Sequence, residues 1–146
     1  AAAIQPNTKL LFGETLGNPG LDVLNIPAVS DVAHAHGLPL LIDSTFTTPY
    51  LIKPFDHGAD LVFHSATKFL SGHGVVIGGL LVDSGNFLWD QSNNFPQLTK
   101  PYAGFHNMIF TLHLSHCISY YAFHTMNFTL CISHYVFHTT NFTLCI

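Results

Sequence analysis

Two stretches decide the fold: Leu38-Pro39-Leu40-Leu41-Ile42-Asp43-Ser44-Thr45 and Ala59-Asp60-Leu61-Val62-Phe63-His64-Ser65-Ala66-Thr67-Lys68. Each contains an apolar run bounded by turn signals, which is typical of a parallel strand buried on both faces. Strand patterns alternate with a helical pattern along the chain, which predicts an α/β fold. In open α/β sheets, ligands bind just beyond the carboxyl ends of the strands. We therefore expect Asp43 and Lys68, which lie 25 positions apart, to project into one crevice.

A helix is predicted before the first of these strands. Asn25 can cap its start, Pro27 suits its first turn and Gly37 suits its end. Lys68 is expected on a loop. The other predicted elements are strands over 9–13, 38–42, 60–64 and 74–82, one helical turn over 54–57 in an otherwise irregular stretch, and loop-like chain over 84–106.

An acid and a lysine in one crevice are the pair that pyridoxal phosphate chemistry requires. The lysine forms a Schiff base with the cofactor, and the acid keeps the pyridine nitrogen protonated. The charged ring can then accept the electrons left when a bond at the substrate α-carbon breaks. Lys68 and Asp43 are the candidates for these two roles.

Three linked motifs resemble those of one enzyme family, the Cys/Met-metabolism family of pyridoxal-phosphate-dependent enzymes. The stretch 65–74 resembles its lysine motif, 43–50 its aspartate segment, and 13–19 its upstream Asn-Pro segment, with Asn18 placed 25 residues before Asp43. The resemblance covers roughly residues 1–111. Within the family it most resembles the O-acetylhomoserine sulfhydrylases. The sequences of four stretches carry this likeness: 12–15, 77–79, 82–87 and 95–99.

The resemblance implies that residues 1–111 are an incomplete part of the large cofactor domain of a fold-type-I pyridoxal phosphate enzyme, a mostly parallel sheet with helices. It makes Lys68 the catalytic residue. It implies that Asn18 contacts the phenolic oxygen of the cofactor, and that Ser65 and Thr67 contact its phosphate. The implied cofactor-binding set is Asn18, Asp43, Ser65, Thr67 and Lys68.

The implied reaction is γ-replacement. By resemblance, the enzyme eliminates acetate from O-acetylhomoserine and adds sulfide or methanethiol at the γ-carbon, which gives homocysteine or methionine. A cystathionine γ-synthase or γ-lyase stays open as an alternative, because these enzymes share the cofactor residues. One departure lies inside the motifs: Ser44 stands where the family usually has Asn. We expect little effect from it, because Asp43 is retained.

A catalytically inactive fragment is a third alternative. The family's glycine-rich phosphate loop and stacking tyrosine would lie before Ala1, and the arginine that holds the substrate carboxylate would lie after the resembling part. The chain contains no arginine, since its four basic residues are all lysines. We therefore expect that the family's full active site cannot be assembled from this chain, even from two copies.

Composition bears on possible partners. Eight acids against four lysines give no basic patch for nucleic acid, and no apolar run approaches the roughly 20 residues of a membrane span. The chain opens on Ala1-Ala2-Ala3-Ile4-Gln5-Pro6, which resembles the middle of a domain, so we expect no signal peptide. The resemblance implies a cytoplasmic enzyme with small-molecule substrates. Full-length members are expected to be homo-oligomers, tetramers by resemblance.

His34 and His36 suit the end of a helix, so no metal site is predicted there.

Residues 112–146 differ in character from the rest. They carry no charged residue, and the stretch 117–130 is repeated with few changes over 131–144, a period of 14. This period is too short for a helical solenoid. The Cys and His residues of the repeat alternate at sevens, whereas zinc sites favour pairs two to four apart. We expect this tail to be no functional domain and to aggregate through β pairing.

Overall fold

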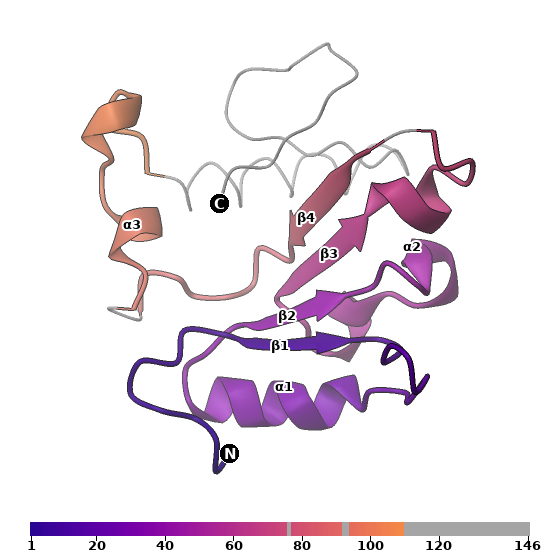
Figure 1. Cartoon of the computed structure of the whole chain (residues 1–146). Helices are drawn as coiled ribbons and strands as arrows, with labels where there is room; N and C mark the ends of the chain where they lie inside the picture. The colour runs from indigo at the N-terminus through magenta and orange to yellow at the C-terminus, as the bar shows by residue number, and fades with distance from the viewer. Residues whose placement is uncertain (76, 92–93, 110–146) are drawn as a thin grey trace. The chain divides into compact units, whose positions relative to one another are not determined.

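The structure is a computed structural model that describes residues 1–75, 77–91 and 94–109 (Figure 1). The described chain falls into two compact units that divide between Val82 and Asp83. The predictions for residues 112–146 lie outside the described residues, so the division at residue 111 stays a prediction.

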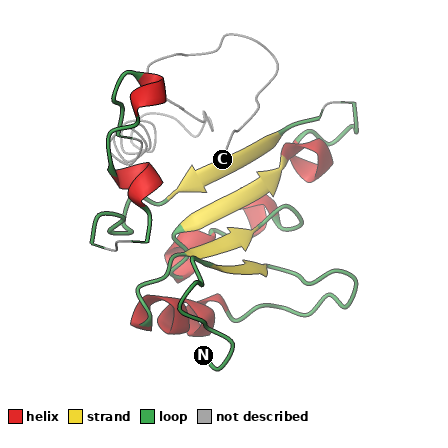
Figure 2. Cartoon of the chain, turned by 60° about the vertical axis from the view of Figure 1, so that its left-hand side comes forward, coloured by secondary structure: helices red, strands yellow, loops and turns green. Residues whose placement is uncertain are grey.

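Four strands form one sheet in the order β1-β2-β3-β4 (Figure 2). Their bounds are β1 Leu11–Glu14, β2 Leu40–Asp43, β3 Leu61–Ser65 and β4 Gly79–Asp83. β1 pairs with β2 in parallel, and β2 pairs with β3 in parallel. The arrow of β4 runs opposite to that of β3 in both views. The prediction of an α/β fold with a mostly parallel sheet is therefore confirmed.

Helix α1 (Ile26–Ala35) connects β1 to β2 and has the predicted ends. The side chain of Asn25 accepts a hydrogen bond from the Ala28 N–H at 3.2 Å. At the other end, Gly37 has a φ of +64°. The N–H groups of Gly37 and Leu38 bond to the carbonyls of His34 and Ala33, which is a Schellman motif.

The core lies on one face of the sheet. It contains Ile26, Ala33, Leu38, Leu40, Ile42, Ala59 and Val62. Phe55, from the 3₁₀ turn η1 (Pro54–His57), packs against the same cluster. Strand residues alternate between faces, and on the other face Leu41, Leu61 and Phe63 are only half-buried while Phe12 is 58% exposed. The prediction that the strands are buried on both faces is therefore wrong for the described residues, because α1 and η1 cover the same face.

Short elements account for the other differences from the predictions. The stretch expected to be irregular contains α2 (Thr48–Leu51) as well as the predicted turn η1. Lys68 lies in a helical turn, η2 (Ala66–Leu70), rather than on a loop. β4 begins at Gly79 and not at Gly74, and the φ of +65° at Gly74 is one that an extended strand does not contain.

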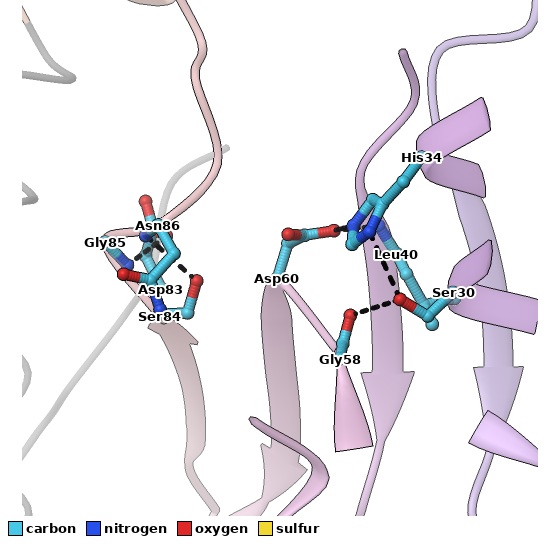
Figure 3. A network of polar contacts seen from close by, with 9 residues as sticks. All are labelled: Ser30, His34, Leu40, Gly58, Asp60, Asp83, Ser84, Gly85 and Asn86. Carbon is cyan, nitrogen blue, oxygen red and sulfur yellow. Dashed lines mark hydrogen bonds and ion pairs between the residues drawn. The ribbon is translucent and has the colours of Figure 1, made fainter. Parts of the chain in front are cut away.

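A polar network ties α1 to the amino ends of β2 and β3 (Figure 3). The buried Asp60 accepts hydrogen bonds from the Leu40 N–H at 2.7 Å and from His34 Nε2 at 2.8 Å. Ser30 donates to the carbonyl of Gly58 at 2.8 Å and lies 3.3 Å from His34 Nδ1. Ser, His and Asp occur together here, but the Ser30 proton is directed at a backbone carbonyl. The network is therefore structural.

The second unit contains an aromatic cluster and two short helices, α3 (Pro96–Thr99) and η3 (Ala103–Phe105). The rings of Phe87, Trp89 and Phe95 meet edge to face, with centroids 4.8–6.2 Å apart. Trp89 Nε1 donates to Asp83 at 3.2 Å, and Asp83 also accepts from the Gly85 N–H, as Figure 3 shows. Loop-like chain was predicted over 84–106, so this prediction missed both helices.

Candidate active site

The carboxyl ends of β1, β2 and β3 lie at one edge of the sheet, because these strands are parallel. At this edge each strand leads into a segment that the sequence singled out: 14–18, 43–48 and 65–68. The structure thus brings the acid and lysine segments to the same edge. The crevice that Asp43 and Lys68 are expected to share stays a prediction.

Asp43 is the last residue of β2 and is half-buried. Its Oδ1 accepts a hydrogen bond from the Thr45 N–H at 2.9 Å. Within the described ranges, its second carboxylate oxygen has no protein donor. The carboxylate is therefore held on one side and available to an outside N–H on the other.

A buried chain of hydroxyl groups supports the Asp43 segment. Thr15, one residue past β1, donates its N–H to the Asp43 carbonyl at 3.0 Å. The Thr15 hydroxyl lies 3.0 Å from the Thr47 hydroxyl, which lies 2.8 Å from the Ser44 hydroxyl. All three side chains are buried. Ser44, the departure from the family pattern, therefore has a structural partner in this chain.

Two contacts join the Asp43 segment to the Lys68 segment. The Ser65 N–H donates to Thr45 Oγ1 at 2.7 Å. The rings of Phe46 and Phe69 meet edge to face at 5.4 Å. These contacts fix the two segments against each other beyond the end of the sheet.

Lys68 is exposed and lies three residues past β3. Its ψ of −117° departs from helical values inside η2, and its carbonyl accepts from the Gly72 N–H at 3.1 Å. Among the described residues, no ion pair involves its amine. The described chain therefore presents this amine to solvent and does not bury it.

The two predicted phosphate ligands differ in their surroundings. Thr67 Oγ1 accepts from the Gly78 N–H at 3.1 Å and lies 3.3 Å from the Gly78 carbonyl, to which it donates. In the described part of the chain, the Ser65 hydroxyl has no hydrogen-bond partner. Ser65 is thus free to donate to a ligand, whereas Thr67 would have to release Gly78.

Asn18 lies on the loop between β1 and α1 and is exposed. It lines a shallow hollow of about 360 Å³ together with Glu14, Gly17, Asp22, Val23 and Leu24. The neighbouring Thr15, and not Asn18, contacts the Asp43 segment in the described structure.

Sequence reasoning did not single out His64, Thr15 or Thr47. His64 is 3% exposed, and its Nδ1 lies 3.1 Å from the Ser44 carbonyl. Burial lowers the pKa of His64, and this outweighs the Ser44 hydrogen bond and the Asp43 charge, which favour the protonated form. A polar residue inside a strand next to a motif was the available signal for His64. The hydroxyl contacts carried no such signal.

The donors present fit pyridoxal phosphate. The group offers a ring nitrogen for a carboxylate, an aldehyde for an amine and a phosphate for hydroxyl and N–H donors. The available oxygen of Asp43, the exposed amine of Lys68 and the unpaired hydroxyl of Ser65 meet these three needs.

The described chain offers neither a metal site nor a membrane-spanning helix. Within residues 1–75, 77–91 and 94–109, no group of three or more His, Cys, Asp or Glu side chains is placed to hold a metal ion. None of the helices in those ranges is both long and apolar enough to span a bilayer. The Cys and His residues of the repeat lie outside the described residues.

Residues 1–114 match the family described as Cys/Met metabolism PLP-dependent enzyme, PLP being pyridoxal phosphate. The chain is 50% identical over 113 residues to homocysteine synthase of Schizosaccharomyces pombe, covering 76% of this chain and 26% of that protein. It is 49% identical over 108 residues to O-acetyl-L-homoserine sulfhydrylase of Leptospira meyeri, covering 74% of this chain and 24% of that protein. The chain therefore spans about a quarter of the length of these curated relatives.

Two of the solved structures that are similar to it illustrate the likeness. One, assigned as O-acetylhomoserine (thiol)-lyase from Campylobacter jejuni and carrying N'-pyridoxyl-lysine-5'-monophosphate, has a TM-score of 0.69 at 30% identity, covering 76% of this chain and 28% of that one. The other, cystathionine γ-lyase from Lactobacillus plantarum complexed with L-serine, has a TM-score of 0.54 at 50% identity, covering 56% and 22%. The parallel sheet, the acid and lysine segments at its edge and the match over residues 1–114 agree: the chain belongs to the Cys/Met metabolism PLP-dependent enzyme family.

Proposed function

We propose that this chain is part of an enzyme that replaces the γ-substituent of O-acetylhomoserine by sulfide or methanethiol, giving homocysteine or methionine. The observation that carries the proposal is identity of about one half to proteins named homocysteine synthase and O-acetyl-L-homoserine sulfhydrylase, over the stretch that contains the candidate site. The arrangement of donors at the strand ends supports it.

The proposed cofactor site consists of Asn18, Asp43, Ser65, Thr67 and Lys68. The carboxylate of Asp43 would keep the ring nitrogen protonated, and Asn18 would contact the phenolic oxygen. Ser65 and Thr67 would donate to the phosphate, with Ser65 the readier donor because its hydroxyl has no partner in the described chain. The amine of Lys68 would hold the cofactor through its aldehyde.

When bound, pyridoxal phosphate supplies a ring that accepts the electrons left at the substrate α-carbon. The amine of Lys68 would move protons at the substrate carbons as a general base and acid. Proton transfer of this kind is most efficient where water is excluded. The described residues leave Lys68 open to solvent. We therefore propose that the 146-residue chain by itself is not catalytically active and does not bind the cofactor tightly.

A cystathionine γ-lyase type of activity is the second candidate. It is favoured by the 50% identity to the Lactobacillus plantarum enzyme over 56% of this chain. That likeness has the lower TM-score of the two solved structures and covers less of the chain. The shared cofactor residues do not separate the two activities, so a direct comparison of O-acetylhomoserine and cystathionine as substrates decides between them.

Four further features belong to this proposal. Residues 1–111 are part of the cofactor domain, and residues 112–146 do not contribute to catalysis. The complete enzyme is cytoplasmic, and it assembles as a homo-oligomer, a tetramer by analogy with the family. Its partners are small molecules.

A chimera tests the proposal. Residues 1–111 replace the equivalent quarter of the Schizosaccharomyces pombe homocysteine synthase, and acetate release from O-acetylhomoserine with sulfide is measured. We expect turnover, together with a pyridoxyl group on Lys68 after borohydride reduction and peptide mapping. Lys68→Ala should lower turnover by at least about 10³-fold and abolish the label. Lys53→Ala, which removes an exposed lysine elsewhere, is the matched control. Labelling at Lys53 or Lys100 instead would refute the assignment of Lys68.

A further inference from the structure

His64 is a polar residue whose side chain is buried inside a strand. It is the fourth residue of β3 and is only 3% exposed. Its side chain does not end in the apolar core alone, because Nδ1 lies 3.1 Å from the carbonyl oxygen of Ser44 on the neighbouring segment. Ser44 follows Asp43 directly, so this contact touches the backbone that carries the candidate acid.

The direction of the hydrogen bond follows from chemistry. A carbonyl oxygen only accepts, so Nδ1 of His64 must carry the proton. Burial lowers the pKa of His64, so the imidazole is neutral near pH 7. A neutral imidazole with its proton on Nδ1 has no proton on Nε2. His64 is therefore a one-directional donor to Ser44 rather than an ion-pair partner of Asp43.

The contact continues the hydrogen bonding between the β2 and β3 segments beyond the last paired residues of the two strands. The last register pair of the two strands is Asp43 with Phe63. The Ser44 N–H then donates to the Phe63 carbonyl at 2.9 Å, and the Ser44 carbonyl accepts from His64. One residue further, the Ser65 N–H donates to Thr45 Oγ1 at 2.7 Å. We call the His64–Ser44 and Ser65–Thr45 bonds the clasp.

The clasp lies between the two reactive side chains along the sequence. On one strand it begins one residue after Asp43, and on the other it ends three residues before Lys68. Both of its bonds have a backbone group on one side, so they fix the path of the chain and not merely the rotamer of a side chain. Loss of either bond would remove one of the contacts that hold the two segments together and loosen the backbone on both sides of it.

We propose that His64 is a positioning residue, which through the Ser44 carbonyl keeps Asp43 at a fixed distance from the Ser65–Lys68 segment. This rests on the proposed function, because only a cofactor that bridges the two segments makes their spacing matter. His64 itself touches neither cofactor nor substrate.

Three substitutions separate positioning from packing. His64→Asn keeps an N–H at the place of Nδ1 and can still donate to Ser44. His64→Gln places its N–H near the position of Nε2 and cannot donate to the Ser44 carbonyl. His64→Leu fills the space of the ring and has no donor. Thr45→Val removes the other bond of the clasp while keeping the shape of the side chain. His57→Leu, at an exposed histidine of η1, is the matched control.

The first measurement needs no cofactor. Hydrogen–deuterium exchange of peptides spanning 43–46 and 64–68 is followed in the full chain at low micromolar concentration. We expect exchange in both peptides to rise about tenfold in His64→Leu and His64→Gln, the loss of about one hydrogen bond, and to stay within about twofold in His64→Asn and His57→Leu. Thr45→Val should raise exchange in the same two peptides.

The second measurement is the affinity of the chimera for pyridoxal phosphate, followed by absorbance. We expect His64→Leu and His64→Gln to weaken it about tenfold and His64→Asn to restore it. Equal behaviour of His64→Asn and His64→Leu in the exchange experiment would overturn the proposal, as would a lowered melting temperature with unchanged exchange at 43–46. If the parent chimera binds no cofactor, the proposed function fails, and the exchange result still decides whether the clasp exists.

Discussion

Replacing Gly58 by Ala tests how tightly the polar network at the amino ends of the strands is packed. Gly58 has a φ of +95°, and a Cβ built there would lie 2.5 Å from Ser30 Oγ. The Ser30 side chain would have to move, which breaks its 2.8 Å hydrogen bond to the Gly58 carbonyl. The backbone strain costs about 1 kcal/mol and the lost bond about 1 kcal/mol more, so we expect a destabilisation of about 2 kcal/mol.

Gly37→Ala is the matched control for this change. Gly37 also has a positive φ, +64°, but a Cβ there would have no heavy atom within 4 Å. It should therefore cost only the strain, about 1 kcal/mol. Both substitutions restrict the unfolded chain equally, so that effect cancels in the comparison.

The assay is urea unfolding of the full chain at low micromolar concentration, followed by circular dichroism. The difference between the two variants should be about 1 kcal/mol, with Gly58→Ala the less stable. Equal free energies of unfolding would show that Ser30 adapts without loss, and the reasoning from the 2.5 Å approach would then be wrong.

Three further predictions concern the site and the tail. In the chimera, Asp43→Asn should keep the pyridoxyl label on Lys68 but lower kcat by about 10²-fold or more, because a neutral amide does not stabilise a protonated ring nitrogen; Asp56→Asn is the control, and parental kcat in Asp43→Asn would exclude the role. Below pH 6.5, the ordinary pKa of histidine, His64 binds a proton more readily in the unfolded state than in the folded state. The free energy of unfolding should therefore decrease as the pH falls from 6.5 to the lowered pKa that His64 has in the folded protein. His64→Asn should make the urea midpoint less dependent on pH in this window, and an unchanged dependence would contradict the burial effect. Removing residues 112–146 should raise solubility, measured by sedimentation, without giving γ-replacement, and a soluble full chain that releases acetate would refute this.

Local signals predicted the carboxyl ends of the strands and the helix well, because short-range chemistry determines them. The Asn25 cap and the turn at Gly37 depend on residues within five positions, and both are present. The order of the parallel strands then placed the 43–48 and 65–68 segments at one edge. The sequence did not predict the contacts that join the 43–48 segment to the 65–68 segment.

The features that were missed depend on tertiary approach. The hydroxyl chain of Thr15, Thr47 and Ser44 joins residues up to 32 positions apart, and no periodicity marks it. His64 looked like an ordinary strand residue, although it crosses to Ser44. Burial of both faces was predicted from apolar runs. Such a run indicates a strand, but it does not indicate which elements pack on each face of the sheet.

The sequential order of β1, β2 and β3 has a consequence for biosynthesis. Every proposed cofactor ligand lies in one uninterrupted stretch of 55 residues, from Glu14 to Lys68. At about 5–20 residues per second, a ribosome makes this stretch in roughly 3–11 s. The register pairs of these three strands all lie within residues 11–63, so every strand partner of the edge that carries Asp43 and Ser65 has been synthesised before β4 is made.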